Sequence, residues 1–83
     1  MFDRSDLEQK FWVAAGNGSL GLCQSLVEQQ KVDINACNSN SRTALHWAAL
    51  HNKVDVVRYL IKNGAVLMED SHGFTPYDLT KTP

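Results

Sequence analysis

The sequence lacks the features that would assign it to a membrane, to nucleic acid or to an oxidising compartment. It has no run of eighteen apolar residues, and its first six residues, MFDRSD, are unlike a secretory signal or a mitochondrial presequence. The eight basic and nine acidic residues are scattered, without the basic stripe that a DNA- or RNA-binding surface needs. Two cysteines, Cys23 and Cys37, occur without a CxxC pattern, and we expect free thiols. A cytoplasmic or nuclear location is therefore expected.

The chain is also too short and too poor in catalytic motifs to predict an enzyme. Its 83 residues make one small domain, which excludes a two-domain enzyme. Gly16 and Gly18 are not followed by the lysine of a phosphate-binding loop, and no serine, histidine and aspartate are arranged as a triad. His46 and His51 are five residues apart, on different helix faces, and lack the spacing of zinc ligands. We expect no catalytic residue, no metal and no cofactor.

Three segments of the chain repeat with a period of about 33 residues. The alanine pair at 14–15 recurs at 48–49, which is 34 residues later, and Thr43 recurs as Thr75, 32 residues later. A period of this length is typical of repeat proteins, in which each unit buries its apolar face on a neighbouring unit.

Each repeated segment predicts two short helices. Apolar residues at i, i+3 and i+4 spacing predict the buried face of each helix. In the first helix of the middle unit these are Leu45, Ala48 and Ala49. In the second helices they are Leu22, Cys23, Leu26 and Val27 in the first unit, and Val56, Val57, Leu60 and Ile61 in the middle unit. Thr43 and Thr75 stand where a helix N-cap belongs, and Gly64 is expected to end a helix in the left-handed conformation. The segments between the units are rich in Asn, Ser, Asp and Gly and predict turns.

These motifs resemble those of the ankyrin repeat. The family signature T-P-L-H-x-A-A appears as TALHWAA at residues 43–49 and in part as TPYDL at residues 75–79. The V-V-x-x-L-L-x-x-G-A stretch appears as VVRYLIKNGA at residues 56–65, and the D-V-N-A stretch appears as DINA at residues 33–36. The resemblance covers nearly the whole chain. It implies an all-α ankyrin-repeat solenoid, in which helix-turn-helix units stack and are joined by extended β-turn loops.

The resemblance divides the single domain, residues 1–83, into an N-capping repeat (6–41), a full repeat (42–73) and the start of a third (74–83). The first unit has a polar opening, typical of a cap, and one extra residue near Lys31. Met68 replaces the usual asparagine in a shortened loop, where we expect an irregular turn.

The third unit stops early, so we expect a chain that continues past Pro83 into more repeats or a catalytic domain, or else self-association. Self-association would use an uncapped C-terminal face, which is predicted to include Tyr59, Ile61, Tyr77 and Leu79.

Two polar residues have roles that the resemblance implies. The signature histidine of the family hydrogen-bonds between adjacent units, which implies this role for His46, with a pH switch as the alternative. The family asparagine commonly fixes the conformation of the loop between units, which implies this role for Asn35. Asn35 is also a candidate for asparaginyl hydroxylation, because Asp33 lies two residues before it, although the extra residue near Lys31 alters the spacing from Leu26.

The resemblance also implies where a partner binds, which is at the turn tips, at the residue before the threonine and at the exposed end of the first helix. In this chain those positions are Asn17, Ser39, Asn40, Arg42, Leu50, His51, His72 and Phe74. Trp47 points away from the predicted packing face, so it either edges this surface or packs on the neighbouring first helix against Val13. We predict a protein-binding strip made of Arg42, Trp47, Leu50, His51 and Phe74, a composition typical of binding hot spots.

The expected function is therefore the binding of a partner protein through a concave surface of loops and first helices, as part of a longer protein. The alternative is a structural segment that caps a longer array and has no binding role of its own. Neither a nucleic-acid partner nor membrane insertion is expected, and the sequence does not identify the protein partner.

Overall fold

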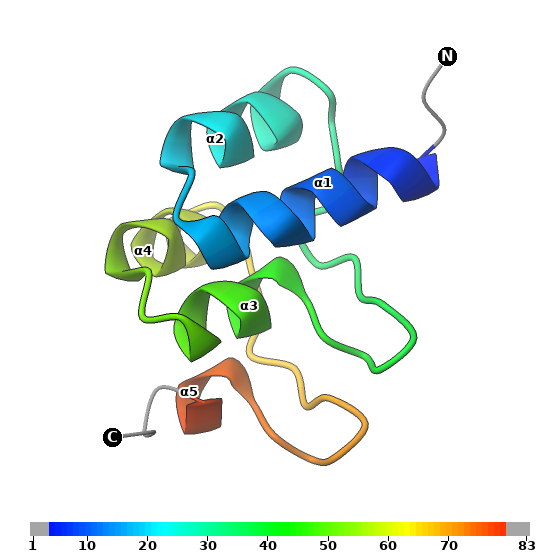
Figure 1. Ribbon diagram of the computed structural model, residues 1–83, viewed down its shortest axis with the longest axis vertical. Coiled ribbons are helices and arrows are strands. Elements are labelled where there is room, and N and C mark those ends of the chain that lie inside the picture. The colour runs from blue at the N-terminus through cyan, green and yellow to red at the C-terminus, as the bar shows by residue number, and fades with distance from the viewer. Residues whose placement is uncertain (1–3, 80–83) are drawn as a thin grey trace.

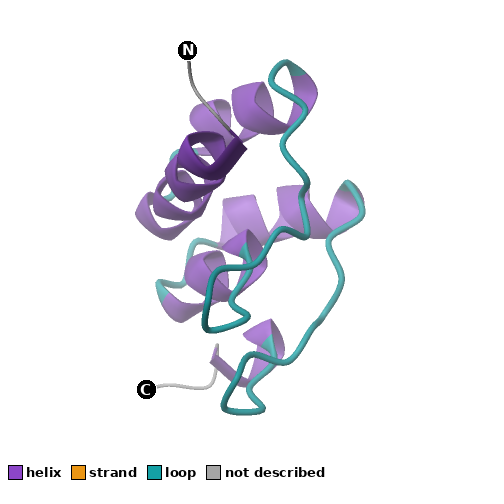
Figure 2. Ribbon diagram, turned by 90° about the vertical axis from the view of Figure 1, so that its right-hand side faces the viewer, coloured by secondary structure: helices purple, strands orange, loops and turns teal. Residues whose placement is uncertain are grey.

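Five helices make up the part of the chain that this computed structural model describes, residues 4–79. They are α1 (Arg4–Asn17), α2 (Leu20–Glu28), α3 (Ala44–Leu50), α4 (Val54–Lys62) and α5 (Pro76–Leu79). α1 packs against α2 and α3 against α4, while α1, α3 and α5 stack in that order (Figure 1). The predicted all-α repeat fold is confirmed. The long loops before α3 and α5 run along the same side of the stack (Figure 2).

The core lies between the helix pairs and is closed by small side chains. Ala14 and Ala15 of α1 and Ala48 of α3 are buried, which lets these helices lie close together. The remaining buried members of the core are Phe11, Cys23, Leu26, Val32, Ala44, Leu45, Val56 and Leu60. The predicted face of α3 is confirmed. Leu22 and Ile61 were also expected in the core, but they are 48% and 52% exposed, because each second helix buries only one narrow face, Cys23 and Leu26 in α2 and Val56 and Leu60 in α4.

The three helix ends that the sequence predicts, at Thr43, Thr75 and Gly64, are confirmed. Thr43 and His46 form a capping box at the start of α3, and the backbone N–H of Thr43 donates to Nδ1 of His46 at 3.0 Å. Thr75 and Asp78 make the equivalent pair at α5, where the N–H of Thr75 donates to Oδ2 of Asp78 at 3.0 Å and the N–H of Asp78 donates to Oγ1 of Thr75 at 3.2 Å. Gly64 follows α4 with a φ of 102°, in the left-handed conformation of a helix C-terminal cap.

The loops before α3 and α5 contain the same hydrogen-bonded turn. Oδ1 of Asn38 accepts the N–H groups of the second and fourth residues after it, at 2.8 and 3.1 Å. Oδ1 of Asp70 accepts the two equivalent N–H groups at 2.9 and 3.0 Å. A residue of positive φ closes each turn, Ser41 at 61° and Gly73 at 83°. Near Met68 the second loop lacks the turn that residues 34–35 form in the first, as expected. The turn that follows it is regular, because Asp70 organises it as Asn38 organises the turn of the first loop.

The extra residue of the first unit is taken up directly after α2. The carbonyl of Leu26 accepts the N–H of the sixth residue after it (3.0 Å), whereas that of Leu60 accepts the N–H of the fifth (2.9 Å). Lys31 has a φ of 60° and so takes the left-handed conformation that Gly64 takes in the second unit. A non-glycine residue in this conformation costs roughly 1–2 kcal/mol.

The face that we expected to be uncapped at the C-terminal side differs from the prediction at two residues. The hydroxyl of Tyr59 donates to Oε2 of Glu28 at 2.6 Å, so Tyr59 faces the first unit. Leu79 is buried, in the helix that packs on α3. Ile61 and Tyr77 are exposed as expected. The predicted unit boundaries stay predictions, and the end of the third unit, residues 80–83, lies outside the described residues.

Candidate protein-binding site

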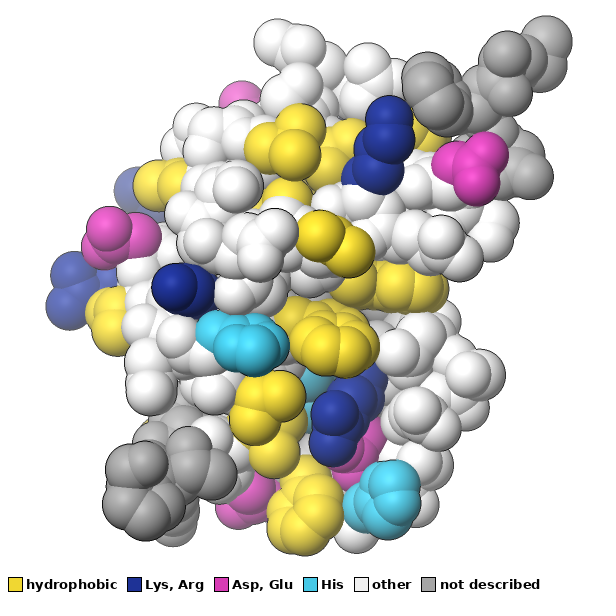
Figure 3. Space-filling model, viewed as in Figure 1, with side chains coloured by type: hydrophobic (Ala, Val, Ile, Leu, Met, Phe, Trp, Pro, Cys, Tyr) yellow, Lys and Arg dark blue, Asp and Glu magenta, His cyan; other side chains and the backbone are white. Residues whose placement is uncertain are grey.

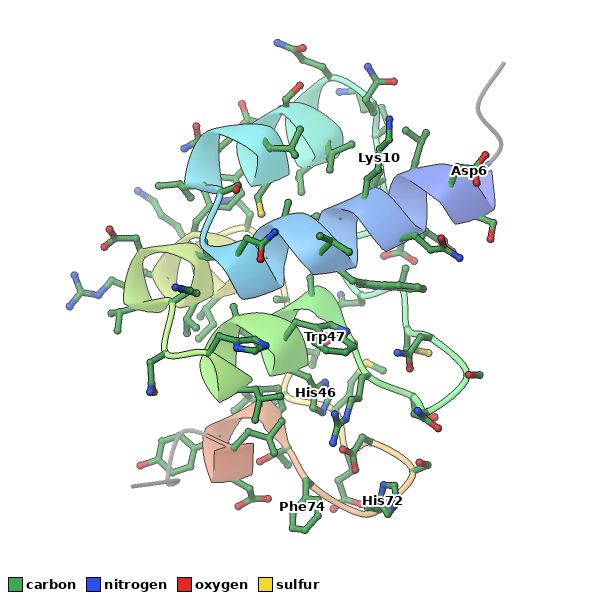
Figure 4. The ribbon with its side chains drawn as sticks, in the orientation of Figure 1. Asp6, Lys10, His46, Trp47, His72 and Phe74 are labelled. Carbon is green, nitrogen blue, oxygen red and sulfur yellow. The ribbon has the colours of Figure 1, made fainter. Side chains whose placement is uncertain are left out.

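The residues predicted to bind a partner come from α1, α3 and the two loop tips, which share one side of the molecule. We call this side the first-helix face and define it by the exposed side of α1 and α3 together with residues 38–42 and 70–74. Figure 3 shows hydrophobic, histidine and Lys or Arg side chains next to one another on this side. Asn17 ends α1, Trp47 and Leu50 lie on α3, and His51 follows α3. His72 and Phe74 lie on the second loop, with Trp47 above them in Figure 4.

A groove runs between α1 and α3 on this face. Its volume is about 370 Å³, and it is lined by Gln9, Trp12, Val13, Gly16, Asn17, Trp47 and His51. Three predicted residues, Asn17, Trp47 and His51, therefore meet in one place. Gly16 contributes no side chain to the groove, and a Cβ atom there would lie 3.4 Å from Cδ2 of His51.

The sequence prediction missed part of this groove. Gln9, Trp12 and Val13 of α1 line it, and Val13 is 62% exposed. Val13 lies 34 residues before Trp47, so the two occupy equivalent positions of successive first helices, and this equivalence could have identified Val13. Trp47 and Val13 line the same groove, and a role for Trp47 in partner binding stays a prediction.

Trp47 is held between the groove and the guanidinium of Arg42. Cζ of Arg42 lies 6.0 Å from the centroid of the Trp47 ring, within the range of a cation–π contact. Nε1 of Trp47 is buried and has no hydrogen-bond partner within residues 4–79. Packing and the guanidinium therefore position this ring, without a hydrogen bond from its nitrogen to the described residues.

Arg42 links the two loops through a buried carboxylate. Nε of Arg42 donates to Oδ2 of Asp70 at 3.1 Å, and the Asp70 side chain is fully buried, whereas that of Arg42 is 26% exposed. The pKa of Asp70 is lowered to about 2, first because the N–H of Phe74 donates to its carboxylate, and then through the N–H of His72 and the Arg42 guanidinium. These bonds offset the opposing effect of desolvation on the pKa.

The loop tips contribute both exposed side chains and fixed backbone. Ser39, Asn40 and His72 are exposed, and Phe74 is 48% exposed. The N–H of Ser71 donates to the carbonyl of Asn40 at 2.9 Å, so the two tips are joined. Neither His72 nor Phe74 lines the groove, and the half-buried Leu50 does not line it either. Of the predicted strip, Trp47 and His51 therefore line the groove, whereas Arg42, Leu50 and Phe74 do not.

His46 and Asn35 make the hydrogen bonds between units that the resemblance implied. Because Nδ1 of His46 accepts from Thr43, its Nε2 carries the proton and donates to the carbonyl of Phe74 at 3.0 Å, and the residue is fully buried. The side-chain Nδ2 of Asn35 donates to the carbonyl of Gly64 at 3.1 Å, and its Oδ1 accepts the N–H of Val66 at 2.8 Å. Hydroxylation of Asn35 stays a prediction.

The described residues contain no group of three or more side chains that could hold a metal ion. Cys23 is buried, which raises the pKa of its thiol to about 11, and Cys37 is exposed. Of the helices within residues 4–79, none is long and apolar enough to cross a membrane.

The sequence pattern that defines the family "Ankyrin repeats (3 copies)" matches residues 11–79, so the chain belongs to the ankyrin-repeat family. Ankyrin repeats are non-catalytic modules that generally bind proteins.

Similar proteins are much longer than this chain. Palmitoyltransferase akr1 of Schizosaccharomyces pombe is 37% identical over 54 residues, which are 65% of this chain and 8% of that protein. Alpha-latrocrustotoxin-Lt1a of Latrodectus tredecimguttatus is 42% identical over 69 residues, which are 82% of this chain and 5% of that protein. Ankyrin repeat domain-containing protein 40 of Homo sapiens is 38% identical over 66 residues, which are 78% of this chain and 18% of that protein. The chain thus matches ankyrin regions within larger proteins and spans less than a fifth of each.

Proposed function

We propose that this chain is a protein-interaction module of a longer protein, and that it binds its partner through the first-helix face. The observation that carries the proposal is the groove between α1 and α3, an open hollow of about 370 Å³ that lies beside the Arg42–Trp47 pair. Tryptophan and arginine are enriched among the residues that dominate binding energy, especially where they border a pocket. The proposed site includes the groove residues together with Arg42, Leu50 and Phe74.

The geometry supports a binding role because the face presents apolar side chains on a backbone that is already fixed. Val13, which lines the groove, and Phe74, on the second loop, are 62% and 48% exposed, so their apolar surface is available to a partner. The loop tips are joined by the Ser71–Asn40 hydrogen bond and by the Arg42–Asp70 ion pair. A partner would therefore meet a surface that needs little ordering on binding.

The test begins with a partner that the chain captures and that mass spectrometry identifies. We expect Trp47→Ala to weaken its binding by about 30-fold, the loss of roughly 2 kcal/mol that defines a hot spot, and Arg42→Ala to weaken it to a similar extent. Arg58→Ala is the matched control, since Arg58 is exposed on α4, away from this face. Circular dichroism verifies that each variant is folded. Unchanged affinity in the two folded variants would show that the partner binds elsewhere.

A second candidate is that the chain forms one end of a longer array or self-associates, and one observation favours it. Val27 of α2 is half-buried, whereas Ile61, its equivalent 34 residues later on α4, is 52% exposed. A following repeat unit or a second copy of the chain would cover the side of α4 that carries Ile61. Sedimentation velocity over a wide concentration range tests self-association. A dimer that Ile61→Glu disrupts supports it, and a monomer at every concentration contradicts it.

A further inference from the structure

We infer that the first-helix face recognises a peptide segment that carries a carboxylate next to a large apolar side chain. The apolar side chain fills the groove between α1 and α3, and the carboxylate binds the guanidinium of Arg42 on the other side of the Trp47 ring. This inference rests on the proposed binding role of the same face and adds the chemistry of the partner.

The apolar half of the site is the groove itself. Trp12, Val13 and Trp47 form its hydrophobic walls, and the missing side chain of Gly16 leaves its hollow open. A volume of about 370 Å³ holds one large side chain, such as that of leucine or phenylalanine. The polar groups at its rim, on Gln9, Asn17 and His51, are suited to hydrogen bonds with the backbone of the bound segment.

The charged half of the site is Arg42. A guanidinium has five N–H donors in a planar fork, and Asp70 accepts only the one on Nε. No hydrogen bond among the described residues uses its two terminal amino groups, and the side chain is 26% exposed. These amino groups match a carboxylate that accepts two parallel hydrogen bonds. The carboxylate of Asp70 is fully buried, so it does not block the approach of an external acid.

The lining of the groove and the guanidinium of Arg42 favour an acidic segment over a basic one. The seven residues that line the groove include a histidine and no carboxylate. Figure 3 shows histidine, Lys or Arg, and Asp or Glu side chains beside the hydrophobic ones on this face, so the preference rests on the lining of the groove and on Arg42. Because the Arg42 guanidinium lies 6.0 Å from the centroid of the Trp47 ring, which itself lines the groove, the two halves of the site are neighbours. One short segment can therefore occupy both halves.

The experiment selects peptides from a display library of random dodecapeptides on the full 83-residue chain. We expect the enriched peptides to share an aspartate or glutamate within about four positions of a large apolar residue, a spacing that keeps both side chains on one side of a helix or strand. A fluorescent synthetic copy of one peptide then gives an affinity by polarisation. Replacing its acid by the matching amide should weaken binding about tenfold or more, since a hydrogen bond to a charged group is lost. This comparison leaves the protein unchanged.

Variants of the chain test the groove and Arg42 separately. Arg42→Gln should weaken binding of the acidic peptide about tenfold and have little effect on its amide form, whereas Arg58→Gln on α4 should not alter either. Val13→Glu should abolish binding by placing a carboxylate at the groove, and Val54→Glu, which alters a comparably exposed valine on α4, should not. Circular dichroism verifies folding, and Arg42→Lys, which keeps the charge and loses the fork, should bind at an intermediate level.

The outcomes separate the two proposals. Peptides that depend on Val13 and yet carry no acid, or tolerate Arg42→Gln, would overturn this inference and leave the binding face in place. Enrichment of no saturable binder would overturn this inference alone, because a folded partner protein could still bind the face. Peptides that bind equally well to Val13→Glu would contradict both proposals.

Discussion

The sharpest prediction concerns His46, whose imidazole joins the second unit to the loop of the third. We expect His46→Ala to lower the free energy of unfolding far more than His51→Ala or His72→Ala. All three residues are histidines of the same chain, but His46 is fully buried and hydrogen-bonded to Thr43 and Phe74, whereas His51 and His72 are exposed. The comparison therefore separates the position of the side chain from its chemistry.

The expected loss in the free energy of unfolding is the sum of the interactions that His46→Ala removes. The N–H of Thr43, a residue only 1% exposed, loses its acceptor, and an unpaired buried donor costs about 1–3 kcal/mol. The hydrogen bond to the carbonyl of Phe74 contributes about 1 kcal/mol, and the cavity adds about 1–2 kcal/mol. Alanine returns about 0.5 kcal/mol through its helix propensity. The net loss is about 3–5 kcal/mol, against a total stability of roughly 4–12 kcal/mol for a chain of this length.

Urea unfolding followed by far-ultraviolet circular dichroism measures these values. Trimethylamine N-oxide is added to every sample, because this osmolyte stabilises folding and keeps the weakest variant measurable. The two exposed histidines should change stability by no more than about 0.5 kcal/mol. A loss below about 1 kcal/mol for His46→Ala, or an equal loss for His51→Ala, would show that His46 does not hold the units together.

Three further predictions test other features of the structure. The folded chain binds fewer protons than the unfolded chain at Asp70, so the stabilisation from this carboxylate is complete above about pH 4 and is lost as the pH falls through about 2, the lowered pKa of the group. Denaturation curves across this range should show that Asp70→Asn, which keeps the accepting Oδ1, lacks this acid dependence; an unchanged dependence would contradict the assignment. A thiol reagent such as 5,5′-dithiobis(2-nitrobenzoate) should label Cys37 at once and Cys23 only on unfolding, because Cys23 is buried with its pKa raised to about 11, and rapid labelling of both would refute the packing. Asn35→Ala should lower the free energy of unfolding in urea by about 1–2 kcal/mol, since two hydrogen bonds between units are lost, and no change would mean that the loop does not depend on them.

The sequence predicted the parts of the fold that depend on one helix at a time. The spacing of Leu45, Ala48 and Ala49 fixes which side of α3 is buried, whichever neighbour covers it. The sequence could not show that Tyr59 faces the first unit. A second helix can contact the preceding or the following unit, and the periodicity of its apolar residues does not distinguish these two neighbours. The Glu28–Tyr59 hydrogen bond joins residues 31 apart and depends on how the units stack.

The candidate site was predictable only in part for the same reason. Trp47 and His51 were found because they are large or polar residues outside the core pattern of one helix. The groove, however, also needs Val13 and Gly16 of the preceding unit at a particular distance from them. In the second loop the sequence predicted a turn, but not that the carboxylate of Asp70 accepts the N–H groups that shape it.

The ion pair between Arg42 and Asp70 also affects how the loop tips move. The tips lie at successive boundaries between units, and the ion pair and the Ser71–Asn40 hydrogen bond join them side by side. Two tips that fluctuate as one lose less conformational entropy when a ligand spans them than two independent tips would lose. In solution, backbone amide relaxation in both tips should therefore change together when either Arg42 or Asp70 is replaced and the ion pair is lost. In the intact chain the two joined tips would move as one rigid edge of the first-helix face. A further unit joined by the same kind of bonds would extend that edge.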